Sequence, residues 1–156
     1  TNTYEPYLSV TITKKVVGDM GDTTKNFSFT ATLDTTQIRQ GSAYTTAGDG
    51  AALTDTGFTL RSGGSVTLTH LRADQTLTLT ETDPGDHTVS WQLNGDDGPT
   101  GVTCTLQVPR AQPAEITCIN TRNVGIPTGL HTGAAPYLAL VGLCWLGWRL
   151  LRCREV

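Results

Sequence analysis

Apolar and polar residues alternate along several short stretches of this chain, and this alternation most constrains how the chain can fold. In the first stretch, 8–16, most apolar residues share one phase and most polar residues share the other. The same pattern returns in four later stretches, 27–33, 66–68, 77–79 and 102–108. Successive side chains of a β-strand point to opposite faces, so each stretch is predicted to be a half-buried strand.

Turn-forming clusters of Gly, Asp, Asn and Pro separate these stretches, for example at 18–22, 83–86 and 94–98. Before residue 134 we find no helical periodicity. The pattern predicts an all-β fold, an immunoglobulin-like antiparallel β-sandwich of about seven strands. The segment 34–56 is the least regular, and we expect a loop excursion there.

Length and charge limit the class of protein further. The 156 residues suffice for one core and a tail. The net charge is -3 and the few basic residues of the first 130 positions are dispersed, so nucleic acid is not expected as a partner. The chain starts at Thr1 with neither Met nor an apolar leader, so we expect a piece of a longer exported precursor, with 1–6 as a linker.

The C-terminal segment is apolar and ends in basic residues. No charge occurs from Ala134 to Trp148, and Arg149, Arg152 and Arg154 follow. If Arg149 snorkels, the segment 134–151 is long enough to be a single transmembrane helix, with 152–156 as a basic cytoplasmic tail. An amphipathic or buried helix is the alternative, but the segment is apolar on every side, which favours the membrane.

The residues Ile126, Pro127, Thr128 and Gly129 precede that apolar segment within the linker 124–133. The order of Pro-Thr-Gly, apolar span and basic tail resembles the cell-wall sorting signals that sortases read. The resemblance implies that a sortase cysteine attacks the Thr128 carbonyl and releases the chain from Gly129 onward. Thr128 would then be joined to an amine of peptidoglycan or of a pilin subunit, and the membrane would hold the chain only before sorting.

Three stretches carry a second resemblance: Leu-Ser-Val-Thr-Ile-Thr-Lys-Lys-Val-Val-Gly at 8–18, Leu-Thr-Leu-Thr-Glu at 77–81, and Ile-Thr-Cys-Ile-Asn-Thr-Arg-Asn at 116–123. They are similar to the first, middle and last strands of the pilin and collagen-adhesin B-type modules of Gram-positive surface proteins, over about 7–123. Those modules form a Lys to Asn isopeptide bond without an enzyme, assisted by a buried acid. The resemblance implies a bond between Lys14 and Asn120, with Glu81 as the assisting acid.

Strand phase supports this assignment from the residues themselves. Lys14, Glu81 and Asn120 each share the phase of the apolar residues in their own stretch, whereas Lys15 has the opposite phase. An apolar interior favours a neutral amine and a protonated acid, so Lys14 would be a nucleophile and Glu81 could polarise the Asn120 carboxamide and move protons. The alternative is an uncrosslinked sandwich in which Lys14 and Glu81 form a buried ion pair beside Asn120.

Cys104 and Cys118 are both seven residues from Ala111. In a hairpin centred on Ala111 they would face each other with Cα atoms about 4.5 to 5.5 Å apart, which is within disulfide range. Export to an oxidising surface favours the disulfide. Two buried thiols are the alternative.

No cofactor or metal is expected, because no histidine lies at ligand spacing from the two core cysteines and the Asp-rich turns lack the pattern of a calcium loop. His70, His87 and His131 are isolated from any nucleophile motif. We therefore expect no enzyme acting on an external substrate.

These features predict a structural or adhesive protein of the cell surface, anchored covalently to the cell wall, as a pilin subunit or an adhesin stalk domain. Its expected partners are sortase, peptidoglycan or pilin subunits, and a host surface or matrix ligand. Two alternatives stay open. One is a permanent single-span membrane protein with an immunoglobulin-like binding ectodomain, and the other is the C-terminal anchor domain of a larger surface enzyme.

Overall fold

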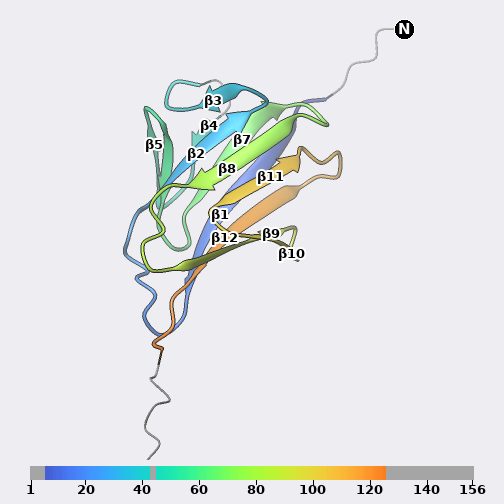
Figure 1. Cartoon of the computed structure of the whole chain (residues 1–156). Helices are drawn as coiled ribbons and strands as arrows, with labels where there is room; N and C mark the ends of the chain where they lie inside the picture. Colours follow the sequence, from blue (N-terminus) through green and yellow to red (C-terminus); the bar gives the residue numbers. More distant parts are fainter. Residues whose placement is uncertain (1–5, 43–44, 126–156) are drawn as a thin grey trace, which may run out of the picture. The chain divides into compact units, whose positions relative to one another are not determined.

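The computed structural model describes residues 6–42 and 45–125, and these form two β-sheets packed face to face (Figure 1). No α-helix occurs among these residues. The prediction of an all-β sandwich is therefore confirmed.

The first sheet, which we call sheet A, has six strands. In spatial order they are β10 (Asp96–Thr100), β9 (Thr88–Leu93), β12 (Ala114–Thr121), β1 (Leu8–Val17), β7 (Ser65–Leu71) and β4 (Thr45–Ala47). Four of the five pairings between neighbouring strands are antiparallel, and the pairing of β1 with β12 is parallel. The first and last strands of the domain thus lie side by side in the middle of sheet A.

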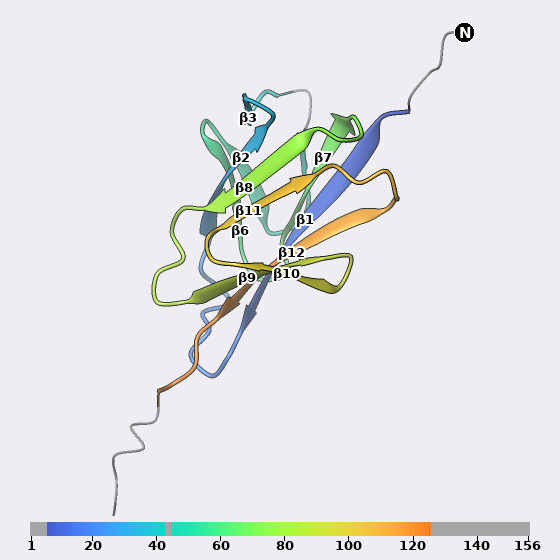
Figure 2. The same ribbon diagram turned by 45° about the vertical axis from the view of Figure 1, so that its right-hand side comes forward.

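The second sheet, sheet B, contains the remaining strands. In spatial order they are β11 (Thr103–Gln107), β8 (Thr76–Glu81), β2 (Phe27–Leu33), β6 (Gly57–Leu60) and β5 (Ala51–Thr54), with β3 (Thr36–Ile38) also paired to β2. All of these pairings are antiparallel. Figure 2 shows β8 and β11 running together across the face of β1 and β12.

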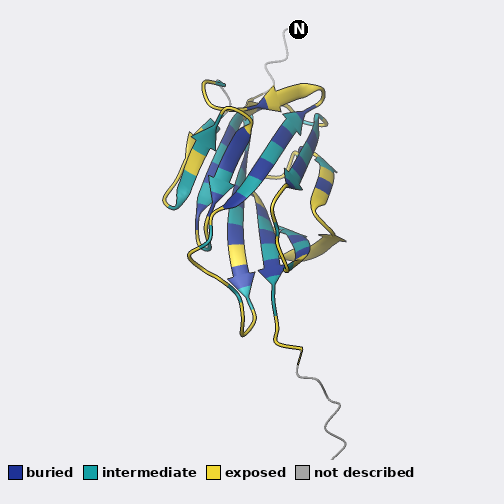
Figure 3. Cartoon of the chain, turned by 60° about the vertical axis from the view of Figure 1, so that its left-hand side comes forward, coloured by how far each residue is buried: buried dark blue, intermediate teal, exposed yellow. Residues whose placement is uncertain are grey.

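The core lies between the two sheets and follows from the alternation in sequence. In β2, Phe27, Phe29, Ala31 and Leu33 are buried while the intervening Ser and Thr residues are only partly buried. The same banding of buried and less buried residues runs along the other long strands (Figure 3). Removing these apolar side chains from water, at about 25 cal/mol per Å², is the main force holding the sheets together.

The junction after β1 depends on a glycine. Gly18 has φ +95, and a Cβ there would lie 2.3 Å from the carbonyl oxygen of Arg122, just after β12. Backbone hydrogen bonds from Arg122 N to Val17 O and from Met20 N to Arg122 O close this junction, both at 3.1 Å. The end of the first strand is thus tied to the end of the last.

Two sequence-based expectations were wrong in detail. The described residues form twelve strands rather than about seven, and the segment 34–56 contains three of them, β3, β4 and β5, rather than only a loop. These strands have three or four residues, which is too short for a period of two to be recognised.

The expected membrane helix at 134–151 and the tail at 152–156 lie outside the described residues. Within the described ranges, no helix meets the length and apolarity needed to cross a bilayer.

Candidate crosslink site

Among the described residues, three polar or charged side chains are buried in the core. Lys14 on β1 and Asn120 on β12 come from sheet A, and Glu81, the last residue of β8, comes from sheet B. Their exposed fractions are 1% for Lys14, 1% for Glu81 and 0% for Asn120. Lys15 is exposed. The prediction that Lys14, Glu81 and Asn120 point inward and Lys15 outward is confirmed.

The parallel pairing of β1 with β12 brings two of these side chains together. Lys14 lies opposite Cys118, and Asn120 lies opposite Val16, two positions further along. Lys14 and Asn120 are therefore diagonal neighbours on the same face of sheet A. Residues so related on adjacent strands are within reach of each other when a side chain is as long as lysine.

Glu81 faces this pair from the opposite sheet. Its carboxylate oxygens Oε1 and Oε2 lie 3.2 and 3.3 Å from Nζ of Lys14. Asn120 donates a hydrogen bond from Nδ2 to the same Oε1 atom, over 2.7 Å. One oxygen of Glu81 thus contacts both the amine of Lys14 and the carboxamide of Asn120.

Aromatic rings surround the amine. Nζ of Lys14 lies 4.5 Å from the ring centroid of Phe27 and 5.5 Å from that of Phe29. The ring of Phe29 also packs edge-on against Trp91, at 6.3 Å between centroids. Such walls exclude water, so charges at this site are not screened and the cluster depends on its own hydrogen bonds.

The thiol of Cys118 also belongs to the cluster, whereas the sequence predicts a disulfide for it. Cys118 is 0% exposed, and its Sγ atom lies 3.2 Å from Nζ of Lys14, 3.5 Å from Oε2 of Glu81 and 3.9 Å from Oδ1 of Asn120. Desolvation by burial, the largest influence, raises the pKa of this thiol to about 12. Cys118 shares the strand phase of Asn120, two residues later. This phase was the sequence signal that its side chain points into the core.

The hairpin expected between the two cysteines does not form. Cys104 lies on β11 in sheet B, where it pairs with Leu79 of β8, and Cys118 lies on β12 in sheet A. Both are buried free thiols, and desolvation also raises the pKa of Cys104. The expected disulfide was wrong because the chain crosses from one sheet to the other between these strands.

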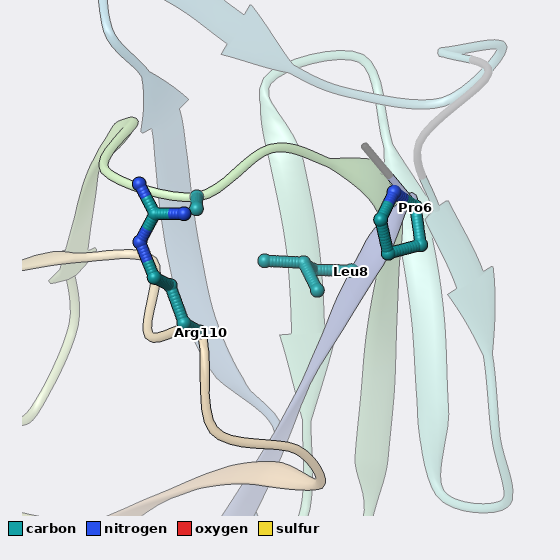
Figure 4. Close-up of a pocket in the computed structure, with 4 residues that line it drawn as sticks. Pro6, Leu8 and Arg110 are labelled. Atoms are coloured by element: carbon teal, nitrogen blue, oxygen red, sulfur yellow. The ribbon is translucent and has the colours of Figure 1, made fainter. Parts of the chain in front are cut away.

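The predicted sorting residues Ile126, Pro127, Thr128 and Gly129 lie outside the described residues. A shallow hollow does occur at the start of β1, where Pro6, Leu8, Ala73 and Arg110 line it (Figure 4). Arg110, among the described lining residues, pairs with Asp74. Within 6–42 and 45–125, no group of His, Cys, Asp and Glu is placed to hold a metal ion.

Comparisons with known proteins agree with this architecture. A pilin of Streptococcus pyogenes serotype M1 is 28% identical over 150 residues, covering 85% of this chain and 44% of the pilin. This chain therefore spans less than half of that relative's length.

Two solved structures share the fold. The major pilin protein of Streptococcus pyogenes superposes with a TM-score of 0.53 at 23% identity, over 74% of this chain and 45% of the pilin. An adhesin from Mobiluncus mulieris, described as containing intramolecular disulfide, isopeptide and ester bond cross-links, superposes with a TM-score of 0.53 at 16% identity. That match covers 74% of this chain and 41% of the adhesin.

The fold and its relatives define the class, an immunoglobulin-like domain of the kind found in Gram-positive pilins and pilus adhesins. The resemblance of 7–123 to pilin and adhesin modules is thereby confirmed. Residues 8–122 match the family described as domain of unknown function (DUF7601), and the chain belongs to that family.

Proposed function

We propose that this chain is a structural subunit of the cell surface, a pilin or an adhesin stalk domain, whose domain at 7–123 is locked by an isopeptide bond between Lys14 and Asn120. The observation that carries the proposal is the buried cluster in which Oε1 of Glu81 contacts both Nζ of Lys14 and Nδ2 of Asn120. A buried ion pair is weak evidence for stability alone, so the cost of burying it favours a chemical role.

The first step is a proton transfer within the cluster. Moving one proton over the 3.2 Å from Nζ of Lys14 to Oε1 of Glu81 converts the ion pair into a neutral amine and a neutral acid. Both neutral forms are favoured in an apolar, water-excluded site. No external base is needed, because Glu81 takes the proton from the nucleophile.

The amine then attacks the carboxamide carbon of Asn120. A bond forms between Nζ and Cγ, and the bond between Cγ and Nδ2 breaks. Glu81 donates its proton as the carboxamide is attacked and receives one from the attacking nitrogen. Of the two protons that the Lys14 ammonium loses in all, one leaves with Nδ2 as ammonia and the other stays on Glu81, which ends as the neutral acid. No oxidant or cofactor takes part.

The position of the bond suits a load-bearing domain. Because β1 and β12 are parallel neighbours, tension between the start of β1 and the end of β12 shears their whole ladder, from Val10 opposite Ala114 to Val17 opposite Thr121. A covalent bond from Lys14 to Asn120 carries the same load in parallel with these hydrogen bonds. The chain from Lys14 to Asn120, a sequence separation of 106 (120 − 14), then cannot be pulled out into extended chain.

We also propose that the chain is sorted to the cell wall through Ile126, Pro127, Thr128 and Gly129. The order of this motif, the apolar segment 134–151 and the basic tail 152–156 supports the proposal. A sortase would be the processing partner and peptidoglycan or a pilin subunit the acceptor. The membrane would hold the chain only until Thr128 is transferred.

The mass of the chain tests the crosslink. The folded protein is expected to weigh less than its composition requires by one ammonia, and a digest should contain a branched peptide joining Lys14 to Asn120. An unmodified mass for the folded protein would refute the bond. Lys14, Glu81 and Asn120 would then be a buried polar cluster without covalent chemistry.

A further inference from the structure

Cys118 contacts every reacting group of the proposed crosslink. Its Sγ atom is within 3.2 Å of the Lys14 amine, 3.5 Å of Glu81 Oε2 and 3.9 Å of Asn120 Oδ1. Backbone pairing imposes this position, because Cys118 lies directly opposite Lys14 in the β1 and β12 register. Cys118 also precedes Asn120 by two residues on β12, which puts both side chains on the core face.

The thiol is protonated in this environment, since burial raises its pKa to about 12. A neutral thiol has one S–H group to donate and a sulfur that accepts weakly. The sulfur accepts a hydrogen bond from Nζ of Lys14, while the S–H group has Oε2 of Glu81 and Oδ1 of Asn120 as its acceptors. Cys118 therefore bridges nucleophile, acid and electrophile.

We propose that Cys118 is a positioning residue for the isopeptide reaction between Lys14 and Asn120, an inference that rests on the function proposed above. Lysine has a flexible four-carbon side chain, and the Glu81 contacts draw its amine toward sheet B. The sulfur of Cys118 holds the amine close to β12, the strand that also carries Asn120. Alignment of a nucleophile with its target lowers the barrier by reducing the freedom lost on reaching the transition state.

A sulfur is suited to this position for a second reason. An oxygen acceptor would stabilise a charged ammonium more strongly, whereas a thiol is a weak hydrogen-bonding group. Cys118 can therefore orient the amine with little hindrance to the loss of its proton to Glu81. It takes no part in bond making or breaking and is unchanged at the end of the reaction.

Refolding kinetics test this role. Because unfolding does not reverse the bond, the full chain is recovered in denaturant from inclusion bodies, before it has folded, and its unmodified mass is verified at time zero. It is then refolded and sampled by intact mass for the loss of ammonia. Tryptophan fluorescence, to which the buried core residue Trp91 contributes beside Trp145 and Trp148, follows folding separately. The variants are Cys118→Ser, which keeps a donor and acceptor, and Cys118→Ala and Cys118→Val, which have neither. The matched control is Cys104→Ala, because Cys104 is also a buried thiol, in the opposite sheet.

We expect Cys118→Ala and Cys118→Val to form the bond about tenfold more slowly than the wild type after folding, because they lose the hydrogen bond to the amine. Cys118→Ser keeps that hydrogen bond but holds the ammonium form more strongly, so it should be slower than the wild type by no more than about threefold. Cys104→Ala should crosslink at the wild-type rate. A role in packing alone predicts the reverse order, with the apolar Cys118→Val nearest the wild type and Cys118→Ser slowest.

The inference is overturned if Cys118→Ala crosslinks as fast as the wild type, or if the variants follow the packing order. If Cys118→Ala does not fold, the comparison of Cys118→Ser with Cys118→Val decides. A wild-type chain that folds without losing ammonia would refute the crosslink itself, and the role of Cys118 with it. A crosslinking wild type with unaffected variants would refute only the role of Cys118.

Discussion

The Nζ atom of Lys14 lies 3.2 Å from Oε1 of Glu81, and the two side chains reach each other from opposite sheets with no exposed surface. This contact crosses the core, whereas the proposed bond joins two strands of one sheet. Glu81 is therefore placed to assist the reaction without being part of its product. Separate substitutions at Glu81 and Asn120 can distinguish these two roles.

Replacing Glu81 with Gln tests its role in proton transfer. The variant keeps the shape of the side chain and its contact with Asn120, but an amide cannot take a proton from Lys14. We expect a folded protein whose intact mass stays at the unmodified value. Lys15→Ala is the control, because Lys15 is the exposed neighbour of Lys14 and its loss should leave the crosslink intact. Rapid crosslinking of Glu81→Gln would contradict the proposed mechanism.

Loss of the crosslink should lower the free energy of unfolding. A bond closing a loop of about 100 residues is worth on the order of 4 to 5 kcal/mol in the chain-entropy model. Asn120→Ala and Glu81→Gln remove different contacts, but both prevent the crosslink. The decrease in the free energy of unfolding that the two variants share therefore reports on the crosslink. Denaturant unfolding of both variants beside the wild type measures it. Wild-type stability in both unlinked variants would show that the bond contributes nothing.

The state of the cysteines can be tested by alkylation without reductant. Cys104 and Cys118 are buried free thiols with raised pKa values, so the folded domain should label slowly at both. After unfolding, both should label fully. Protection of both in the unfolded chain would instead indicate a disulfide, contrary to the structure.

The raised pKa of Cys118 also predicts how stability changes with pH. Folding raises this pKa from about 9.0 to about 12. The contribution of the protonated thiol to the free energy of unfolding is therefore fully present below pH 9. Above that pH the unfolded chain loses the proton first, and stability falls as the pH rises toward 12. Cys118→Ala should show a smaller loss over this window than the wild type in urea unfolding at matched pH values. Parallel losses in both proteins would show that Cys118 does not titrate as expected.

The junction after β1 predicts a cost for Gly18→Ala. Alanine there combines a φ of +95 with a Cβ 2.3 Å from the Arg122 carbonyl oxygen. Gly95 is the matched control, because its φ is +88 but no atom lies within 4 Å of the position of its Cβ. Gly95→Ala should cost about 1 kcal/mol from backbone strain alone, and Gly18→Ala clearly more. Equal melting temperatures for the two variants would mean that the contact with Arg122 is relieved without cost.

Wall anchoring can be tested on material released from cells. If Thr128 is joined to the wall, muramidase should release a chain that ends at Thr128, whereas a permanent membrane protein would need detergent. Peptides containing Cys144 or Trp148 on wall-released protein would contradict sorting.

Much of the site was predictable because burial within a strand is a local property. A period of two assigns every residue of a strand to one face or the other, so Lys14, Glu81 and Asn120 could be placed inside from their own neighbours. The all-β class followed from the same signal. Short strands such as β3 and β4 could not be predicted in this way, because three residues are too few to show a period of two.

Pairing between strands was not predictable from phase. The segment between β11 and β12 was expected to form a hairpin, and the two strands instead joined different sheets. Phase placed Cys104 and Cys118 inside correctly but said nothing of which strand each would lie beside. The contact of Cys118 with Lys14 depends on the parallel register of β1 and β12, which brings together residues 104 positions apart (118 − 14).

The sequence by itself therefore determined which side chains are buried, including the costly lysine and glutamate, since alternation along a strand involves only near neighbours. The tertiary structure alone decided that Glu81 faces Lys14 across the core and that Cys118 joins them. Those contacts depend on which strands are adjacent and in what register, and both are set by packing of the whole core, because many pairings satisfy the same alternation.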